Sequence, residues 1–299
     1  MNMKLSLGPV LYYWQRDAMM NFYLQAATWP VDVVYLGETV CSRRHNLRTD
    51  DWLRIAAELR DAGKQVVLST LTLIESESDL KTMRRLAENG EFLVEANDMG
   101  AVHRLSGMPF VAGSQLNVYN PSTLDILAEL GACRWVIPLE MSRGKLADLL
   151  AHKPANMETE IFVYGRMPLA HSARCFTARH YNKSKDECQF RCLEHPYGLD
   201  LDTREGKPFL ALNGTQTQSS HVYSLLAEVQ SMRGMGDVLR ISPQPLQTGE
   251  VVTLFQAALE GDVSATSKLS SLLPAQACDG YWHGAAGMLA SADLASFME

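Results

Sequence analysis

The sequence predicts an α/β chain folded as a (β/α)₈ barrel resembling the TIM barrel. Eight short β-rich runs recur along the chain, and segments with helical patterns lie between them. The runs are almost continuously apolar, which is typical of parallel strands covered on both faces. The runs are residues 5–14, 32–38, 65–73, 91–96, 109–114, 134–140, 159–165 and 237–243.

Four of the intervening segments are predicted to be helices. In residues 49–64, Thr49 or Asp50 can cap the first turn, an apolar stripe of helical period follows, and Gly63 ends the segment. Residues 120–132 repeat this plan, with Pro121 in the first turn and Gly131 at the end. The same reasoning predicts helices over 221–236 and 251–260.

The main alternative is a doubly wound open sheet. Its glycine-rich fingerprint, G-x-G-x-x-G after the first strand, is absent from the sequence, and so is a P-loop. The count of strand-like runs therefore favours the barrel. No linker or internal repeat interrupts the chain, so we expect one domain over 1–299. It includes an excursion over 172–210 after the seventh strand and a C-terminal tail.

Composition narrows the classes of partner. The 299 residues include 27 Lys and Arg against 34 Asp and Glu, a net charge of −7. No basic run stands out, which disfavours nucleic acid as a partner. No apolar run is long enough to span a membrane and no targeting signal is recognisable, so we expect a cytoplasmic protein.

Three of the six cysteines lie in SARCFTARHYNKSKDECQFRC, residues 172–192. Cys175, Cys188 and Cys192 have the spacing C-x₁₂-C-x₃-C. Thiols stay reduced in the cytosol, which disfavours a disulfide framework. Zinc knuckles usually use two tight cysteine pairs, whereas a [4Fe–4S] cluster tolerates uneven spacing. A metal or cluster site is favoured, and free cysteines on a polar loop remain the alternative.

A fourth thiol would come from Cys41, Cys133 or Cys278. Cys133 opens an apolar run, which favours a core position. Cys41 follows the second strand, so a barrel would place it at the C-terminal mouth, where the excursion also leaves the barrel. Cys278 remains an alternative in the tail.

Two further sets of residues are candidates for the site. One contains arginines that flank the cysteines and could balance their negative charge: Arg43, Arg44, Arg174 and Arg179. The other contains polar residues at strand ends, which a barrel would gather around its mouth. They are Glu38, Ser69, Thr70, Asn97, Asp98, Ser114, Gln115, Asn117, Glu140, Tyr164, Arg166 and the possible proton carrier His171.

The cysteine segments resemble a known family. SARCFT followed by C-x₃-C resembles the cysteine motif of the collagenase-like peptidase family, many of whose members are iron–sulfur proteins. YLGETVCSRR resembles the family segment after strand two. One branch of the family is similar through nearly the whole chain. The stretches that carry this similarity are SLGPVLYYW, VVYLGETVCSRR, QVVLSTL, PFVAGSQLNVYN, PLAHSARCFTARH, KDEC…C, VLRISPQ and CDGYW.

The resemblance implies a [4Fe–4S] cluster held by Cys41, Cys175, Cys188 and Cys192. It also implies a heterodimer with a UbiU-like protein that, with a lipid-binding accessory protein, hydroxylates a quinone precursor in ubiquinone biosynthesis without O₂. Prephenate is implied as the oxygen donor. In the broader family the fourth thiol lies downstream of the motif, which would replace Cys41 by Cys278.

Three other functions remain to be weighed. One is RNA-base hydroxylation by a related family member, and another is a subunit that only stabilises its partner. Peptidase activity is not expected, because no Ser, His and acid arrangement and no HExxH motif is present.

Overall fold

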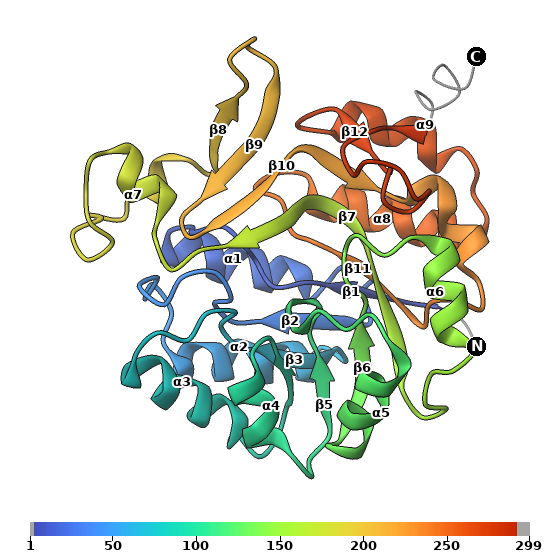
Figure 1. Ribbon diagram of the computed structural model, residues 1–299, viewed down its shortest axis with the longest axis horizontal. Coiled ribbons are helices and arrows are strands. Elements are labelled where there is room, and N and C mark those ends of the chain that lie inside the picture. Colours follow the sequence, from blue (N-terminus) through green and yellow to red (C-terminus); the bar gives the residue numbers. More distant parts are fainter. Residues whose placement is uncertain (1–2, 292–299) are drawn as a thin grey trace.

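The computed structural model describes residues 3–291 and contains a closed barrel of parallel strands (Figure 1). The eight strands pair in the order β11-β1-β2-β3-β4-β5-β6-β7, and β11 also pairs with β7, which closes the barrel. Their bounds are β1 Lys4–Leu7, β2 Val33–Leu36, β3 Gln65–Ser69, β4 Leu93–Ala96, β5 Phe110–Ala112, β6 Ala132–Val136, β7 Glu158–His171 and β11 Val238–Ile241. The predicted fold class is confirmed.

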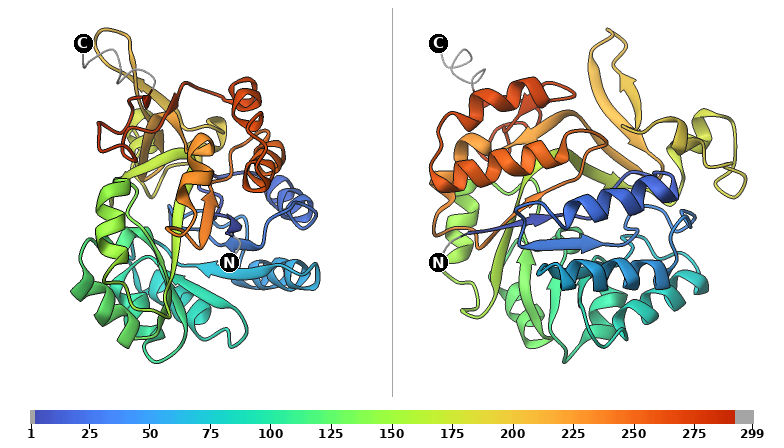
Figure 2. Two further views of the ribbon diagram at one scale, coloured as in Figure 1. Left: turned by 90° about the vertical axis from the view of Figure 1, so that its right-hand side faces the viewer. Right: turned by 180° about the vertical axis from the view of Figure 1, so that it is seen from behind.

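Helices cover the outside of the barrel (Figure 2). The longer helices are α1 Arg16–Ala26, α2 Thr49–Asp61, α3 Glu77–Ala87, α4 Met99–Leu105, α5 Pro121–Glu129, α6 Arg143–Leu150 and α8 Thr248–Glu260. Shorter ones are η1 Ser114–Leu116, α9 Ala265–Leu269 and η4 Ser270–Leu272. The helices predicted over 49–64, 120–132 and 251–260 are confirmed. None of the helices within residues 3–291 is both long and apolar enough to cross a bilayer.

The helix predicted over 221–236 is wrong. Its first part belongs to β10 (Gln216–Ser224), and only Leu226–Met232 is helical, as the 3₁₀ helix η3. The buried residues Val222, Leu225, Leu226 and Val229 have helical spacing, which explains the error. Strand geometry prevails because β10 pairs with β7 on one side and with β12 (Ala277–Cys278) on the other.

A small second layer of sheet grows from the end of β7. The first part of β7 is a barrel strand between β6 and β11, and its last part pairs antiparallel with β10. β9 (Pro208–Asn213) and β8 (Leu199–Asp202) continue this sheet as the hairpin that projects at the top of Figure 1. The segment between β7 and β8 carries α7 (Phe176–His180) and η2 (Arg191–Glu194). We refer to residues 172–198 as the cysteine arm.

The inside of the barrel is not purely apolar. A small cluster of Val33, Tyr35, Val67, Val111 and Val136 is surrounded by charged groups that alternate with apolar ones along the strands. Arg240 bonds Glu160 through Nε at 2.8 Å and Glu95 through Nη1 at 2.7 Å.

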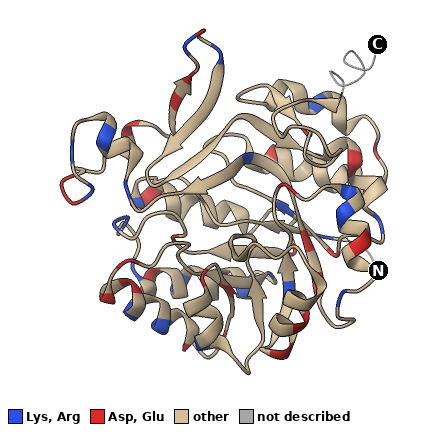
Figure 3. Ribbon diagram, in the orientation of Figure 1, with Lys and Arg blue, Asp and Glu red and all other residues tan. Residues whose placement is uncertain are grey.

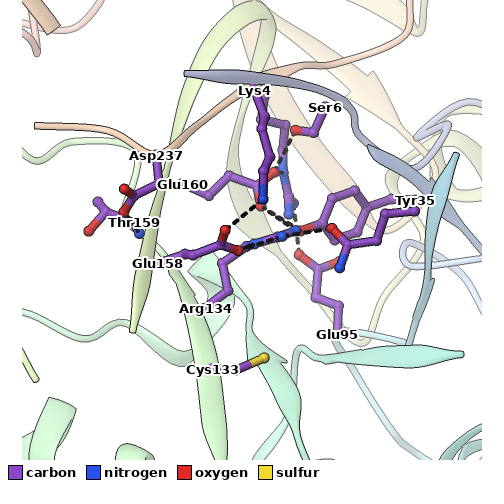
Figure 4. Close-up of polar contacts among 12 residues, drawn as sticks. Lys4, Ser6, Tyr35, Glu95, Cys133, Arg134, Glu158, Thr159, Glu160 and Asp237 are labelled. Carbon is purple, nitrogen blue, oxygen red and sulfur yellow. Dashed lines mark hydrogen bonds and ion pairs between the residues drawn. The ribbon is translucent and has the colours of Figure 1, made fainter. Parts of the chain in front are cut away.

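These ion pairs belong to a larger network. Tyr35 donates to Glu160 at 2.5 Å, and Arg134 Nη2 donates to Glu158 at 2.6 Å (Figure 4). Burial alone would raise the pKa of Glu160, but Arg240 and Arg134 outweigh it and hold that pKa below its ordinary value. The barrel therefore contains paired buried charges, which are costly to separate.

Candidate cysteine site and barrel-mouth pocket

Four of the six cysteines line one cavity. Cys41 comes from the loop after β2, Cys175 immediately precedes α7, Cys188 lies in the loop that leads into η2, and Cys192 lies in η2 itself. Cys278 is buried on β12 and Cys133 lies on β6, where its thiol donates to the carbonyl of Phe110 at 3.3 Å. Neither lines this cavity. The structure thus brings together the four cysteines expected as ligands.

Local backbone geometry positions these thiols. The Cys175 Sγ accepts the N–H of Ala178 at 3.4 Å, in the place of an N-cap side chain. Between Cys188 and Cys192, both Gln189 (φ 51°) and Phe190 (φ 53°) adopt the left-handed conformation. Two successive non-glycine residues in this region cost roughly 1–2 kcal/mol each. This strained turn points the two thiols of C-x₃-C toward the same cavity.

The cavity has a positive wall. Arg44 is buried beside Cys41 and Cys192, and the half-exposed Arg43 pairs with Asp186 at 2.7 Å. Burial raises the pKa of the Cys41 thiol to about 11, although Arg44 counteracts this. Burial also raises the pKa of Cys192. Of the arginines expected around the site, Arg43 and Arg44 line the cavity, whereas Arg174 and Arg179 are exposed and do not.

The donor set fits an iron–sulfur cluster. Four soft sulfur ligands from three segments of the chain line one cavity, as thiolate ligation of a cluster requires. Arg44 Nε and Arg191 Nε, on two residues of the cavity wall, are buried donors without a hydrogen-bond partner. Such donors are the groups that hydrogen-bond cluster sulfurs. Within the described part of the chain, no three His, Cys, Asp or Glu side chains are grouped to hold a single metal ion.

A larger pocket opens at the C-terminal mouth of the barrel. Its cavity volume is about 100 Å³, which is smaller than that of typical small-molecule sites. Six of the polar residues predicted at the mouth line it: Asn97, Ser114, Gln115, Asn117, Glu140 and His171.

The other predicted mouth residues have different roles. Asp98 caps α4 by accepting the N–H of Gly100, and Glu38 accepts the N–H groups of Val40 and Cys41. The remaining four are buried side chains that do not line the pocket: Ser69, Thr70, Tyr164 and Arg166.

The most important pocket residue was missed by the sequence analysis. Arg240 lines the pocket and is only 7% exposed, and its Nη2 has no hydrogen-bond partner. Its other guanidinium nitrogens are held by Glu160 and Glu95. The available signal was a single charged residue inside each of the apolar runs VLRIS and FLVEA. A charge in a barrel strand that is otherwise apolar must be paired inside the barrel.

His171 forms part of the pocket wall in its neutral form. Burial lowers the pKa of its imidazole to about 4, so the ring is uncharged near neutral pH. Its Nε2 lies 3.0 Å from the side-chain nitrogen of Gln216, which also lines the pocket. A neutral imidazole has one N–H donor and one ring-nitrogen acceptor, so it can make hydrogen bonds without placing a charge on the pocket wall.

Fold and site together define a barrel protein that carries a four-cysteine site beside the pocket at its mouth. The model of peptidase family U32 matches residues 20–271, and the chain belongs to this family. This confirms the peptidase-family resemblance of the cysteine motifs.

Three similar proteins share only low sequence identity with the chain. tRNA hydroxylation protein P of Escherichia coli (strain K12) is 26% identical over 193 residues, which cover 61% of this chain and 42% of that protein. The match therefore spans less than half of the length of this curated relative. The structure of the U32 peptidase Mk0906 is 14% identical, with a TM-score of 0.47 over 82% of this chain and 94% of that one. Dihydrodipicolinate synthase from Aquifex aeolicus is 10% identical, with a TM-score of 0.47 over 90% and 80%.

Proposed function

We propose that the chain is the UbiV-type subunit of a UbiU–UbiV heterodimer, binds one [4Fe–4S] cluster, and serves O₂-independent hydroxylation in ubiquinone biosynthesis. The proposal of a cluster rests on one observation. Cys41, Cys175, Cys188 and Cys192 line one cavity. The quinone assignment is supported by the motif resemblance along the chain and by the net charge of −7. A lipid-binding accessory protein is the further partner of this proposal.

The mouth pocket is the proposed place for the small-molecule substrate. The unpartnered Arg240 Nη2 can donate a charge-assisted hydrogen bond to a carboxylate. The amides of Asn97, Gln115 and Asn117 and the neutral His171 can bind hydroxyl or carbonyl groups. Prephenate, a dicarboxylate, suits this lining as oxygen donor.

The chain's own residues then perform three tasks. Arg240 orients the carboxylate, and its ion pairs with Glu95 and Glu160 keep the guanidinium fixed. His171 accepts the amide N–H of Gln216 at Nε2, so its neutral ring keeps its proton at Nδ1, where it can donate a hydrogen bond. The four thiols would hold the cluster, which supplies one-electron transfer when bound.

Substitution of single cysteines tests the proposal. Anaerobically purified protein is expected to contain about four irons per chain and to absorb near 400 nm. Cys→Ala changes at 41, 175, 188 and 192 should each remove the cluster. Changes at 133 and 278, which lie outside the cavity, serve as matched controls and should leave it intact. A colourless Cys278 variant beside a coloured Cys41 variant would refute the proposed ligand set.

Hydroxylation of an RNA base is the second candidate, because one relative is named a tRNA hydroxylation protein. Basic residues are interspersed with acidic ones along the ribbon in Figure 3, which does not favour a phosphate-binding face. A deletion strain grown without O₂ decides between the two. Accumulated quinone precursors support the proposed function, whereas normal quinone with loss of an RNA-base hydroxylation supports the second. If variants without the cluster restored quinone synthesis, the chain would only stabilise its partner.

A further inference from the structure

The cysteine cavity and the mouth pocket are separated by a thin polar wall. Arg44 lines the cysteine cavity and Gln216 lines the mouth pocket, while Asn213 lies between them and lines neither. These side chains are almost fully buried, at 4% exposed for Arg44, 1% for Gln216 and 3% for Asn213. We refer to these three residues as the polar wall.

The wall is continuously hydrogen-bonded. Arg44 Nη2 donates to Asn213 Oδ1 at 2.7 Å, and Asn213 Nδ2 donates to Gln216 Oε1 at 3.3 Å. The amide nitrogen of Gln216 then lies 3.0 Å from Nε2 of His171 in the mouth pocket. The carbonyl of Leu11 braces the wall, because it accepts from Arg44 Nη1 at 2.7 Å and from Asn213 Nδ2 at 2.8 Å.

The turn between β9 and β10 holds this wall in place. Gly214 has φ +68°, and a Cβ built there would lie 2.9 Å from Arg44 Nη2. The hydroxyl of Thr215 donates to the carbonyl of Val40 at 2.6 Å, which ties the turn to the loop that carries Cys41. The turn therefore fixes Asn213 against Arg44 and the Cys41 loop at once.

Arg44 is the charged end of the wall. Its Nη1 lies 3.7 Å from Glu38, and its Nε is buried without a partner, on a residue that lines the cysteine cavity. In a buried setting a charge acts over a longer range than in water. The charge on the cluster would therefore act on Arg44, and through the dipoles of Asn213 and Gln216 on a ligand in the mouth pocket.

We propose that the polar wall couples the cluster to the mouth pocket, with Arg44 as the positioning residue at the cluster end. This inference rests on the proposed function. An anion bound in the pocket and the reduced cluster are both stabilised by the positive charge of Arg44. Anion binding therefore disfavours reduction of the cluster, because reduction makes the cluster more negative. The coupling is reciprocal, so the oxidised protein binds the anion more tightly. A tenfold difference in affinity corresponds to about 59 mV for a one-electron couple.

Anaerobic redox titration of the full chain, with and without prephenate, tests the coupling. In the wild type, prephenate is expected to lower the midpoint potential of the cluster. Asn213 itself lines neither cavity, so in Asn213→Leu the iron content and prephenate binding should persist while the ligand-induced shift is lost. Asn213→Asp keeps an acceptor for Arg44 but cannot donate to Gln216. It is therefore the second variant should Asn213→Leu fail to fold, and its shift should also be reduced.

Arg179→Gln is the matched control, because it removes an exposed positive charge on the cysteine arm outside the wall. Its ligand-induced shift should equal that of the wild type. A full shift in both Asn213 variants overturns the coupling. A wild type with four irons that binds prephenate without any shift overturns the inference and leaves the proposed function standing. An iron-free wild type overturns both.

Discussion

At the scale of single residues, the unpartnered Arg240 Nη2 is the clearest sign of a ligand site. Arg240→Lys keeps the positive charge but loses the forked guanidinium. We expect prephenate to bind at least tenfold more weakly, since a lost charge-assisted hydrogen bond is worth roughly 1.5–3 kcal/mol. Calorimetry on the anaerobic protein measures this. Arg134→Lys is the control, because Arg134 belongs to the same network but does not line the pocket. Equal losses in both variants would mean that the network, and not the pocket, responds.

His171 makes stability depend on pH. Its folded pKa of about 4 lies below its ordinary value of 6.5, so the unfolded chain takes up a proton first as the pH falls. The stabilisation is complete above pH 6.5 and is lost toward pH 4, by at most roughly 3 kcal/mol. His171→Asn should therefore lose less stability than the wild type between pH 7 and pH 5. Denaturant unfolding at the two pH values checks this, and parallel losses would argue against a buried neutral His171.

At the scale of elements, the β9–β10 turn determines how closely the backbone approaches Arg44. Gly214 requires a left-handed backbone and faces Arg44, whereas Gly206 (φ +74°), in the β8–β9 loop, has no atom within 4 Å of a built Cβ. Both Gly→Ala changes cost roughly 1–2 kcal/mol of backbone strain. Gly214→Ala should cost more than Gly206→Ala because its methyl group also displaces Arg44. Comparison of the two free energies of unfolding isolates the contact, and equal costs would show that Arg44 moves away freely.

The sequence contains a signal for this turn that the analysis missed. The run FLALNGTQT places Asn-Gly between strand-like residues, which is the strongest short hairpin signal. The helical spacing in the following residues obscured it, so residues 221–224, the end of β10, were predicted as the start of a helix over 221–236. By contrast, helices α2 and α5 follow their caps and apolar stripes closely, because nothing outside those segments competes with their local preferences.

At the scale of the whole molecule, the ion network inside the barrel stabilises the folded state. Glu160→Gln leaves Arg240 and Arg134 partly unpaired in a buried setting, which we expect to cost roughly 3–5 kcal/mol. Glu158→Gln is a milder control, since that side chain is 35% exposed. Denaturant unfolding at pH 7 measures both changes. A loss for Glu160→Gln no larger than for Glu158→Gln would contradict the role of the buried charge.

The same network sets the response to acid. The folded pKa of Glu160 is lowered, so its ionised form stabilises the fold above the ordinary carboxyl pKa. That contribution disappears as the pH falls through the folded pKa. The extra stability of the wild type over Glu160→Gln should therefore shrink in acid, and the pH dependence of the unfolding free energy checks it.

The barrel could be predicted because eight apolar runs alternate with helical segments. This pattern specifies the fold whichever polar residues the runs also contain. The cysteines could be selected because thiols are rare and chemically distinctive, and strand position separates Cys41 from Cys133. The polar wall could not be predicted in this way. Asn213 and Gln216 are ordinary polar residues, and only the register of β9 against β10 places them between the two cavities.

One feature of the fold has a mechanical consequence. β7 runs for 14 residues from the barrel wall to the start of the cysteine arm, with an irregularity near Gly165, which has φ 127°. This one strand connects Glu158 and Glu160, near its first end, with His171 at its last position. A partner bound to the cysteine arm would therefore also exert force on the barrel wall through β7. We expect force on the arm to be carried along this strand to the ion pairs inside the barrel.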